Sequence, residues 1–194
     1  MGDTYQAVVD VDANAEESVT LAQRVVERLS REGIILPTLD PDAVLGGDGG
    51  YRPADRVKIM FAGDPRNSFL RLSTNGIEVK TGRWVNVFGF PILSYFMCPC
   101  CGETFRVDHS VGDEFARAAD EFLNGVAKPV VACPNCLQES AAQDWPTKPH
   151  LGFAHLAFVF WNWWFFGDDC WTVDVPRLIA EELDHNVVLT FGKV

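Results

Sequence analysis

The stretch LAFVFWNWWFFGDDCW, residues 156–171, decides the fold, because it combines a strand pattern with four of the chain's six tryptophans. FVF, residues 158–160, alternates as a strand that turns one face to a core. The rings of Trp161, Trp163 and Trp164, with two further phenylalanines, exceed what one strand face buries. We therefore expect either a second small core, such as one beneath an inserted segment, or an aromatic patch that anchors a protein partner.

The same stretch is too short to cross a membrane. Its apolar run from Leu156 to Phe166 has 11 residues and is interrupted by Asn162, whereas a spanning helix needs about 20. The first residues are acidic and lack the cationic and apolar regions of a secretory signal. We therefore expect a cytoplasmic protein without membrane contact. In that reducing compartment cysteines bind metals more often than they form disulfides.

Strand and helix patterns occur in the same order at both ends of the chain. Residues 5–13, YQAVVDVDA, alternate as a strand with one mostly polar face, and a helix follows from a cap at Asn14 to a stop at Gly33. The apolar stripe of this helix is formed by Val19, Ala22, Val25, Val26 and Leu29. After the aromatic stretch, a helix over residues 175–183 precedes the strand NVVLTF. This repetition favours an α+β fold.

The middle of the chain adds extended segments and turns. FLRLSTNGIEVKTG, residues 69–82, predicts a hairpin around Asn75-Gly76. GGDGG, residues 46–50, lacks the Lys-Ser/Thr of a phosphate-binding loop and predicts a flexible acidic loop. We expect one α+β domain over residues 1–194, built on a mainly antiparallel sheet with one-sided helices and with the cysteine-bearing segment inserted.

Two Cys-Pro-x-Cys motifs, CPCC at residues 98–101 and CPNC at residues 133–136, are separated by 31 residues. Two residues between thiolates allow a tight turn to direct both sulfurs at one ion, and proline fixes one backbone angle of that turn. Four thiolates complete a tetrahedral shell for zinc with no open position, so the predicted site is structural.

These motifs resemble the knuckles of zinc-ribbon proteins over Cys98 to Cys136. The resemblance implies one structural zinc ion held by Cys98, Cys101, Cys133 and Cys136. The sequence departs from a ribbon in three ways: Cys100 offers a competing ligand, Leu137 stands where glycine follows the second knuckle, and a helix is expected over Val111–Leu123. Iron, as in rubredoxins, and free thiols or a disulfide remain as alternatives.

The order of motifs along the whole chain also resembles a group of uncharacterised bacterial proteins that sometimes carry the label sugar ABC transporter ATPase. The chain contains no Walker A motif and is too short for an ATP-binding cassette. We therefore do not adopt that label, and the resemblance implies only a bacterial cytosolic origin.

Charge argues against nucleic acid as a partner. The formal net charge is −11 with a pI near 4.7, and such a chain repels phosphate backbones. Residues 51–84 are the exception, with seven Lys or Arg against three Asp or Glu. Between Cys98 and Cys136 six acids oppose three bases, and four thiolates around zinc would add a net charge of about −2. The predicted insertion is therefore strongly negative.

No catalytic motif is present. The four histidines form no HExxH pattern, no Gly-x-Ser-x-Gly occurs, and Cys170 follows Asp168-Asp169, which disfavours a thiolate. We expect a non-catalytic protein-binding protein that neutralises a basic partner, as immunity proteins do.

The alternative is an enzyme or small-anion-binding domain. Its site would lie between the basic region 51–84 and the aromatic segment 156–171, with Arg52, Arg71 or Arg83 gripping an anion.

Overall fold

The computed structural model describes residues 2–60, 65–86, 95–106, 110–163 and 174–194. Trp164 and Cys170, which the sequence singles out, lie outside the described residues. Of the described helices, none combines the length and the apolar character that a membrane crossing requires.

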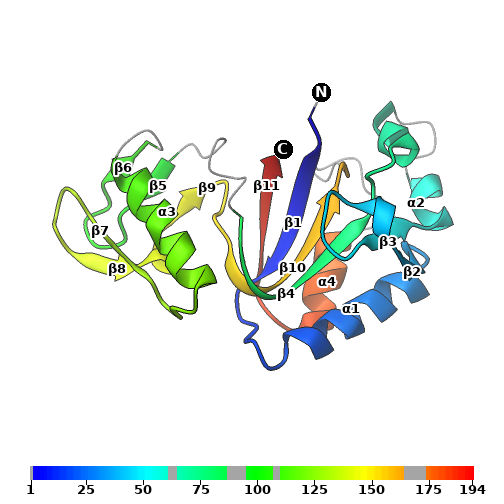
Figure 1. The fold of residues 1–194 in the computed structure, drawn as a ribbon, viewed down its shortest axis with the longest axis horizontal. Helices are drawn as coiled ribbons and strands as arrows, with labels where there is room; N and C mark the ends of the chain where they lie inside the picture. Colours follow the sequence, from blue (N-terminus) through cyan, green and yellow to red (C-terminus); the bar gives the residue numbers. More distant parts are fainter. Residues whose placement is uncertain (1, 61–64, 87–94, 107–109, 164–173) are drawn as a thin grey trace.

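A six-stranded sheet forms the centre of the larger lobe, and its strand order is β11-β1-β10-β4-β3-β2. Every neighbouring pair in it is antiparallel. Its strands are β1 (Thr4–Asp10), β2 (Ile35–Asp40), β3 (Gly50–Pro53), β4 (Ile77–Val85), β10 (Phe153–Trp161) and β11 (Val187–Lys193). The aromatic stretch thus supplies β10, which lies between β1 and β4 near the middle of the sheet (Figure 1). The predicted α+β class with a mainly antiparallel sheet is confirmed.

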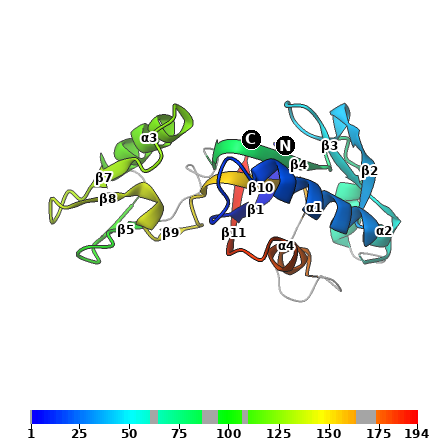
Figure 2. The same ribbon diagram turned by 90° about the horizontal axis from the view of Figure 1, so that it is seen from below.

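Two helices, α1 (Ser18–Arg31) and α4 (Val175–Leu183), contact each other and cover one face of the sheet (Figure 2). Their buried residues meet Val8, Phe158 and Phe160 from the central strands. Asp174 caps α4 by accepting a hydrogen bond from the amide of Arg177, and a proline lies in the first turn. Shorter elements lie at or near the β2 edge: α2 (Asp55–Met60) and the 3-10 helices η1 (Pro41–Ala43) and η2 (Pro65–Arg71).

A smaller lobe, the cysteine module, is inserted between the paired strands β4 and β10 and lies to one side of the sheet (Figure 1). It contains β5 (Tyr95–Met97), β6 (Thr104–Phe105), α3 (Ser110–Leu123), β7 (Val130–Ala132), β8 (Glu139–Ala141), the 3-10 helix η4 (Ala142–Asp144) and β9 (Thr147–Lys148). Phe96 stacks on Phe115 with ring centroids 4.3 Å apart, and Trp145 meets Phe115 edge-on at 5.5 Å. These rings belong to a second hydrophobic cluster, which includes Phe96 and Trp145 from outside the expected range 98–136 and continues into Val85 of β4 and Phe153 of β10.

The expected hairpin at residues 69–82 is wrong, because residues 69–71 end the 3-10 helix η2 and residues 72–76 form no strand. The buried Asn75 side chain donates to the carbonyls of Phe69 and Leu70 and thereby ties this helix to the start of β4. Gly76 approaches Ala43 so closely that an added Cβ would lie 2.6 Å from the alanine Cβ. The glycine is thus needed for close packing rather than for a type I′ turn.

Two details of the N-terminal elements are worth noting beside their sequence patterns. The mostly polar face of the first strand is buried, since Gln6 and Asp10 lie on the helix-covered side with Val8. Val19 is exposed, whereas Leu21, Ala22, Val25 and Leu29 form the buried stripe of α1.

Candidate functional site: a four-cysteine metal centre and an apolar pocket

The two cysteine turns have the same backbone hydrogen bonds. In the first, the amide of Cys98 donates to Glu103 O at 2.8 Å and the amide of Gly102 donates to Cys98 O at 2.9 Å. In the second, the amide of Cys133 donates to Gln138 O at 2.9 Å and that of Leu137 donates to Cys133 O at 2.9 Å. Each Cys-Pro-x-Cys motif therefore folds into one of the two expected knuckles.

The two knuckles bring four sulfurs together. The sulfurs of Cys98, Cys101, Cys133 and Cys136 all lie within 4.8 Å of one another. The Sγ–Sγ distance is 3.9 Å from Cys98 to Cys136 and 3.8 Å from Cys101 to Cys133. A tetrahedral ion with metal–sulfur bonds of about 2.3 Å separates its ligands by about 3.8 Å. The spacing thus fits one ion with four thiolate ligands.

Donors around the cluster favour thiolates. The amide of Cys100 donates to Cys98 Sγ at 3.3 Å, and Asn135 Nδ2 donates to Cys101 Sγ at 3.7 Å. Burial opposes ionisation of Cys98, yet the amides of Cys101 and Cys100 outweigh it and lower the pKa of this thiol to about 6.

The pKa of the Cys136 thiol is shifted in the opposite direction. The Gln138 amide favours the Cys136 thiolate, but burial and hydrogen bonds with the neighbouring thiols outweigh it and raise the pKa of Cys136 to about 12. A divalent ion that binds all four sulfurs as thiolates displaces the protons that the thiols carry, so its affinity should fall at acidic pH.

The three departures from a zinc ribbon are accommodated. The exposed Cys100 does not belong to the convergent group of sulfurs. The expected helix over Val111–Leu123 is present as α3 and builds the module core beside Cys98 and Cys133. Leu137 has φ 60°, close to the φ of 74° at the corresponding Gly102. A leucine thus occupies a backbone conformation that favours glycine.

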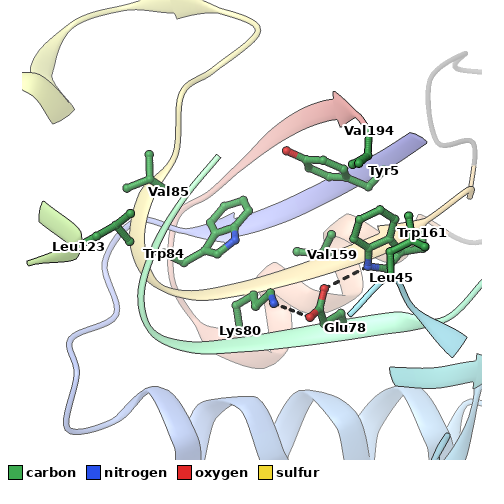
Figure 3. Close-up of a pocket in the computed structure, with 10 residues that line it drawn as sticks. All are labelled: Tyr5, Leu45, Glu78, Lys80, Trp84, Val85, Leu123, Val159, Trp161 and Val194. Carbon is green, nitrogen blue, oxygen red and sulfur yellow. Dashed lines mark hydrogen bonds and ion pairs between the residues drawn. The ribbon is translucent and has the colours of Figure 1, made fainter. Parts of the chain in front are cut away.

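A pocket of about 310 Å³ lies on the sheet face opposite α1 and α4 (Figure 3). The described residues that line it are Tyr5, Leu45, Glu78, Lys80, Trp84, Val85, Leu123, Val159, Trp161 and Val194. Strand pairing places Tyr5 opposite Trp161 and Val159 opposite Glu78, so three adjacent strands form its floor. Leu123, at the end of α3, brings the cysteine module to the pocket's edge.

The pocket floor contains an ion pair whose carboxylate is buried and whose ammonium is partly exposed. The Glu78 side chain is 5% exposed, and its carboxylate accepts a hydrogen bond from Trp161 Nε1 at 3.0 Å and pairs with the ammonium of Lys80. Burial raises the pKa of Tyr5, whose hydroxyl donates to Asn86 Oδ1. The glutamate and the lysine are therefore the charged side chains among the described lining residues.

The structure separates the two predicted tryptophans. Trp161 is buried on the pocket face, where it contacts Tyr5 with ring centroids 5.4 Å apart. Trp163 is buried in the core under the helices, and its Nε1 donates to Asn75 O. Neither ring is an exposed anchor in this arrangement.

The predicted arginines have different surroundings. Arg52 donates to Asp40 Oδ2 at 2.6 Å and to Ser73 O and Asn75 Oδ1. The Arg83 guanidinium donates to three carbonyls at the end of α3, those of Phe122, Gly125 and Val126, at 2.8–3.0 Å. Arg71 is exposed at the end of η2.

Sequence reasoning missed the pocket residues Tyr5, Glu78, Lys80 and Trp84. Tyr5 lies on β1 and the other three lie on β4, so their convergence depends on β10, which comes much later in the chain and pairs with both strands. The spacing of Glu78 and Lys80, two residues apart on one strand face, was the available signal.

A second buried carboxylate pairs with a histidine. Asp10, whose side chain is fully buried, accepts the amides of Asp12 and Ala13 and lies 2.9 Å from His185 Nδ1. This hydrogen bond raises the pKa of His185. The pair joins the end of β1 to the turn between α4 and β11 and thereby links both ends of the chain.

Comparison with known proteins gives no relative, since no protein-family model, no curated protein and no solved structure matches the chain.

Proposed function

We propose that the chain is a non-catalytic, zinc-stabilised binding protein of the bacterial cytosol that recognises a basic protein partner through its cysteine module. Zinc is the proposed ion because four thiolates in a tetrahedral arrangement suit it and leave no position open for substrate or water. The convergent sulfurs of Cys98, Cys101, Cys133 and Cys136 support this assignment. The ion joins two knuckles that are 31 residues apart in sequence, and its role is structural.

The binding proposal rests on the exposure and the backbone conformation of Leu137. Its side chain is 78% exposed, so it contributes little to the core. Its backbone φ of 60° lies in the left-handed region, which costs an L-residue about 1–2 kcal/mol more than it costs glycine. A strained and exposed leucine at the tip of a knuckle weakens the fold locally, which is typical of residues retained for function. We assign it as the apolar anchor of the interface.

Charge defines the kind of partner. Apart from Arg117, the exposed charges of the module are the acids Glu103, Asp113, Asp120, Glu139 and Asp144 and the bases Arg106, Lys128 and Lys148, so acids are in excess. Arg117 is already paired with Glu114 and Glu121 on α3. A zinc ion with four thiolates adds about two further negative charges beside Leu137. A basic protein surface is therefore the complementary partner, and its association should be fast and salt-sensitive, as for immunity proteins and toxins.

The anion-binding alternative has less support. Arg52 and Arg83 already donate to a carboxylate and to backbone carbonyls, so gripping an anion would require these contacts to break. Arg71 is exposed, but no contact places it at the pocket.

The test compares affinity-tagged wild type with Leu137→Gly and Leu39→Ala in the native cell. Leu39, 51% exposed on β2, is the matched apolar control. We expect wild type and Leu39→Ala to retain the same basic protein in native mass spectra, with loss at high salt. Leu137→Gly should keep its zinc and lose that protein. Equal retention by Leu137→Gly, or capture of no basic protein, would contradict the proposal.

A further inference from the structure

The pocket on the uncovered sheet face has aromatic and aliphatic walls and a small polar floor. Tyr5, Trp84 and Trp161 present rings to it, and the exposed side chains of Leu45 and Val194 form part of its edge (Figure 3). This composition is typical of small-molecule sites, in which apolar walls bind the body of the ligand and a few polar groups fix its orientation.

The floor offers a directed hydrogen-bond donor. The Lys80 ammonium is paired with Glu78, and the carboxylate is held in turn by the Trp161 indole. An ammonium has three donors, and within the described residues Glu78 takes one of them. The other two can bind an acceptor on a ligand, because about a third of the Lys80 side chain remains exposed.

The charges of the floor balance. Glu78 and Lys80 neutralise each other, and the Tyr5 hydroxyl stays uncharged because burial raises its pKa. A charged ligand would leave its charge without a counter-charge among apolar walls, which is costly. The pocket therefore favours an uncharged molecule.

Volume limits the ligand's size. The cavity measures about 310 Å³, and a dry cavity of about 150 Å³ holds one benzene ring. The space thus suits a molecule of about two rings.

A glycine loop sets the shape of the floor. A Cβ on Gly47 would lie 2.5 Å from Glu78 Oε1, so a side chain at this position would push the carboxylate out of its contacts with Trp161 and Lys80. The loop that includes Gly47 also carries Leu45 to the pocket edge. The GGDGG segment therefore helps to build the pocket.

We propose that this pocket binds an uncharged aromatic or alicyclic molecule of about two rings, with its rings among Tyr5, Trp84 and Trp161 and a hydrogen-bond acceptor on the Lys80 ammonium. This inference does not depend on the partner proposed for the Leu137 surface. Either proposal can fail while the other stands.

The probe for the test is 6-propionyl-2-(dimethylamino)naphthalene, an uncharged two-ring ketone whose emission shifts to the blue in apolar sites. We expect saturable 1:1 binding with energy transfer from tryptophan. Leu45→Asp at the pocket edge should weaken it at least tenfold, and so should Trp84→Ala. Leu39→Asp, the matched exposed leucine outside the pocket, should leave binding unchanged.

The role of Lys80 is tested by the double variant Glu78→Gln with Lys80→Met, which removes both charges together. The amide oxygen that replaces the Glu78 carboxylate can still accept a hydrogen bond from Trp161. This variant should weaken the ketone several-fold and leave unchanged the affinity of naphthalene, which has no acceptor, as calculated from its displacement of the probe.

Three outcomes would overturn the assignment. They are unsaturable binding, equal losses in the Leu45 and Leu39 variants, and tighter binding of the anionic probe 1-anilinonaphthalene-8-sulfonate than of the ketone.

Discussion

Replacing either of two neighbouring glycines by alanine separates backbone strain from contact with the pocket floor. Gly46 and Gly47 have φ angles of 74° and 75°, so alanine meets the same backbone strain at both positions. At Gly46 nothing lies within 4 Å of an added Cβ, whereas at Gly47 the Cβ would lie 2.5 Å from Glu78 Oε1. Gly47→Ala must therefore displace the buried carboxylate.

The size of the difference follows from the contacts of Glu78. Moving its carboxylate disturbs the hydrogen bond from Trp161 Nε1 and the ion pair with Lys80. A hydrogen bond to a charged group contributes about 1.5–3 kcal/mol. We expect Gly47→Ala to be about 2 kcal/mol less stable than Gly46→Ala. For a chain of this size that difference lowers the melting temperature by about 4–8 °C.

Differential scanning calorimetry of the two variants measures this difference directly. Tryptophan emission should also change in Gly47→Ala alone, because the Trp161 indole loses its acceptor. Melting temperatures within about 1 °C of each other would refute the account of the pocket floor.

Three further predictions concern the knuckles, the module junction and the buried histidine pair. Gly102→Val should weaken zinc binding about fivefold in chelator competition, because a side chain at φ 74° costs about 1 kcal/mol. Leu137→Gly removes a side chain from the same backbone conformation and should bind zinc at least as tightly as wild type. Arg83→Ala removes three hydrogen bonds to the end of α3 and should lower the free energy of unfolding by about 2 kcal/mol in urea titrations, a loss that Arg83→Lys should recover only in part. The pKa of His185 is raised in the fold, so its bond to Asp10 stabilises fully below the unfolded pKa of about 6.5 and is lost as pH rises through the folded pKa. The deficit of His185→Gln in urea unfolding should therefore be larger at acidic than at alkaline pH, and a constant deficit would count against the pair.

Local patterns predicted the fold class. The helix of residues 175–183, with proline in its first turn, and the strand that became β10 needed no tertiary information, because apolar periodicity specified them. The hairpin at residues 69–82 failed for the opposite reason. Asn75 is held by Arg52 and by the carbonyls of η2, and these contacts override the local turn preference.

The two candidate sites also differ in how far the sequence alone predicts them. The cysteine centre was predictable because spacing within each motif largely fixes where its sulfurs point. The pocket was not, because Tyr5, Glu78 and Trp161 meet only through strand register. The aromatic excess around Trp161 signalled an unusual region, but one tryptophan entered each of two cores.

X-ray absorption at the zinc edge, with metal analysis of the same sample, shows whether the four sulfurs hold a structural zinc ion. We expect one zinc per chain with four sulfur neighbours at about 2.3 Å and no nitrogen or oxygen ligand. Cys100→Ser should give the same spectrum, whereas Cys101→Ser should lose a sulfur neighbour or the ion. Iron in place of zinc, a light-atom ligand in the wild type, or no bound metal would contradict the structural zinc centre.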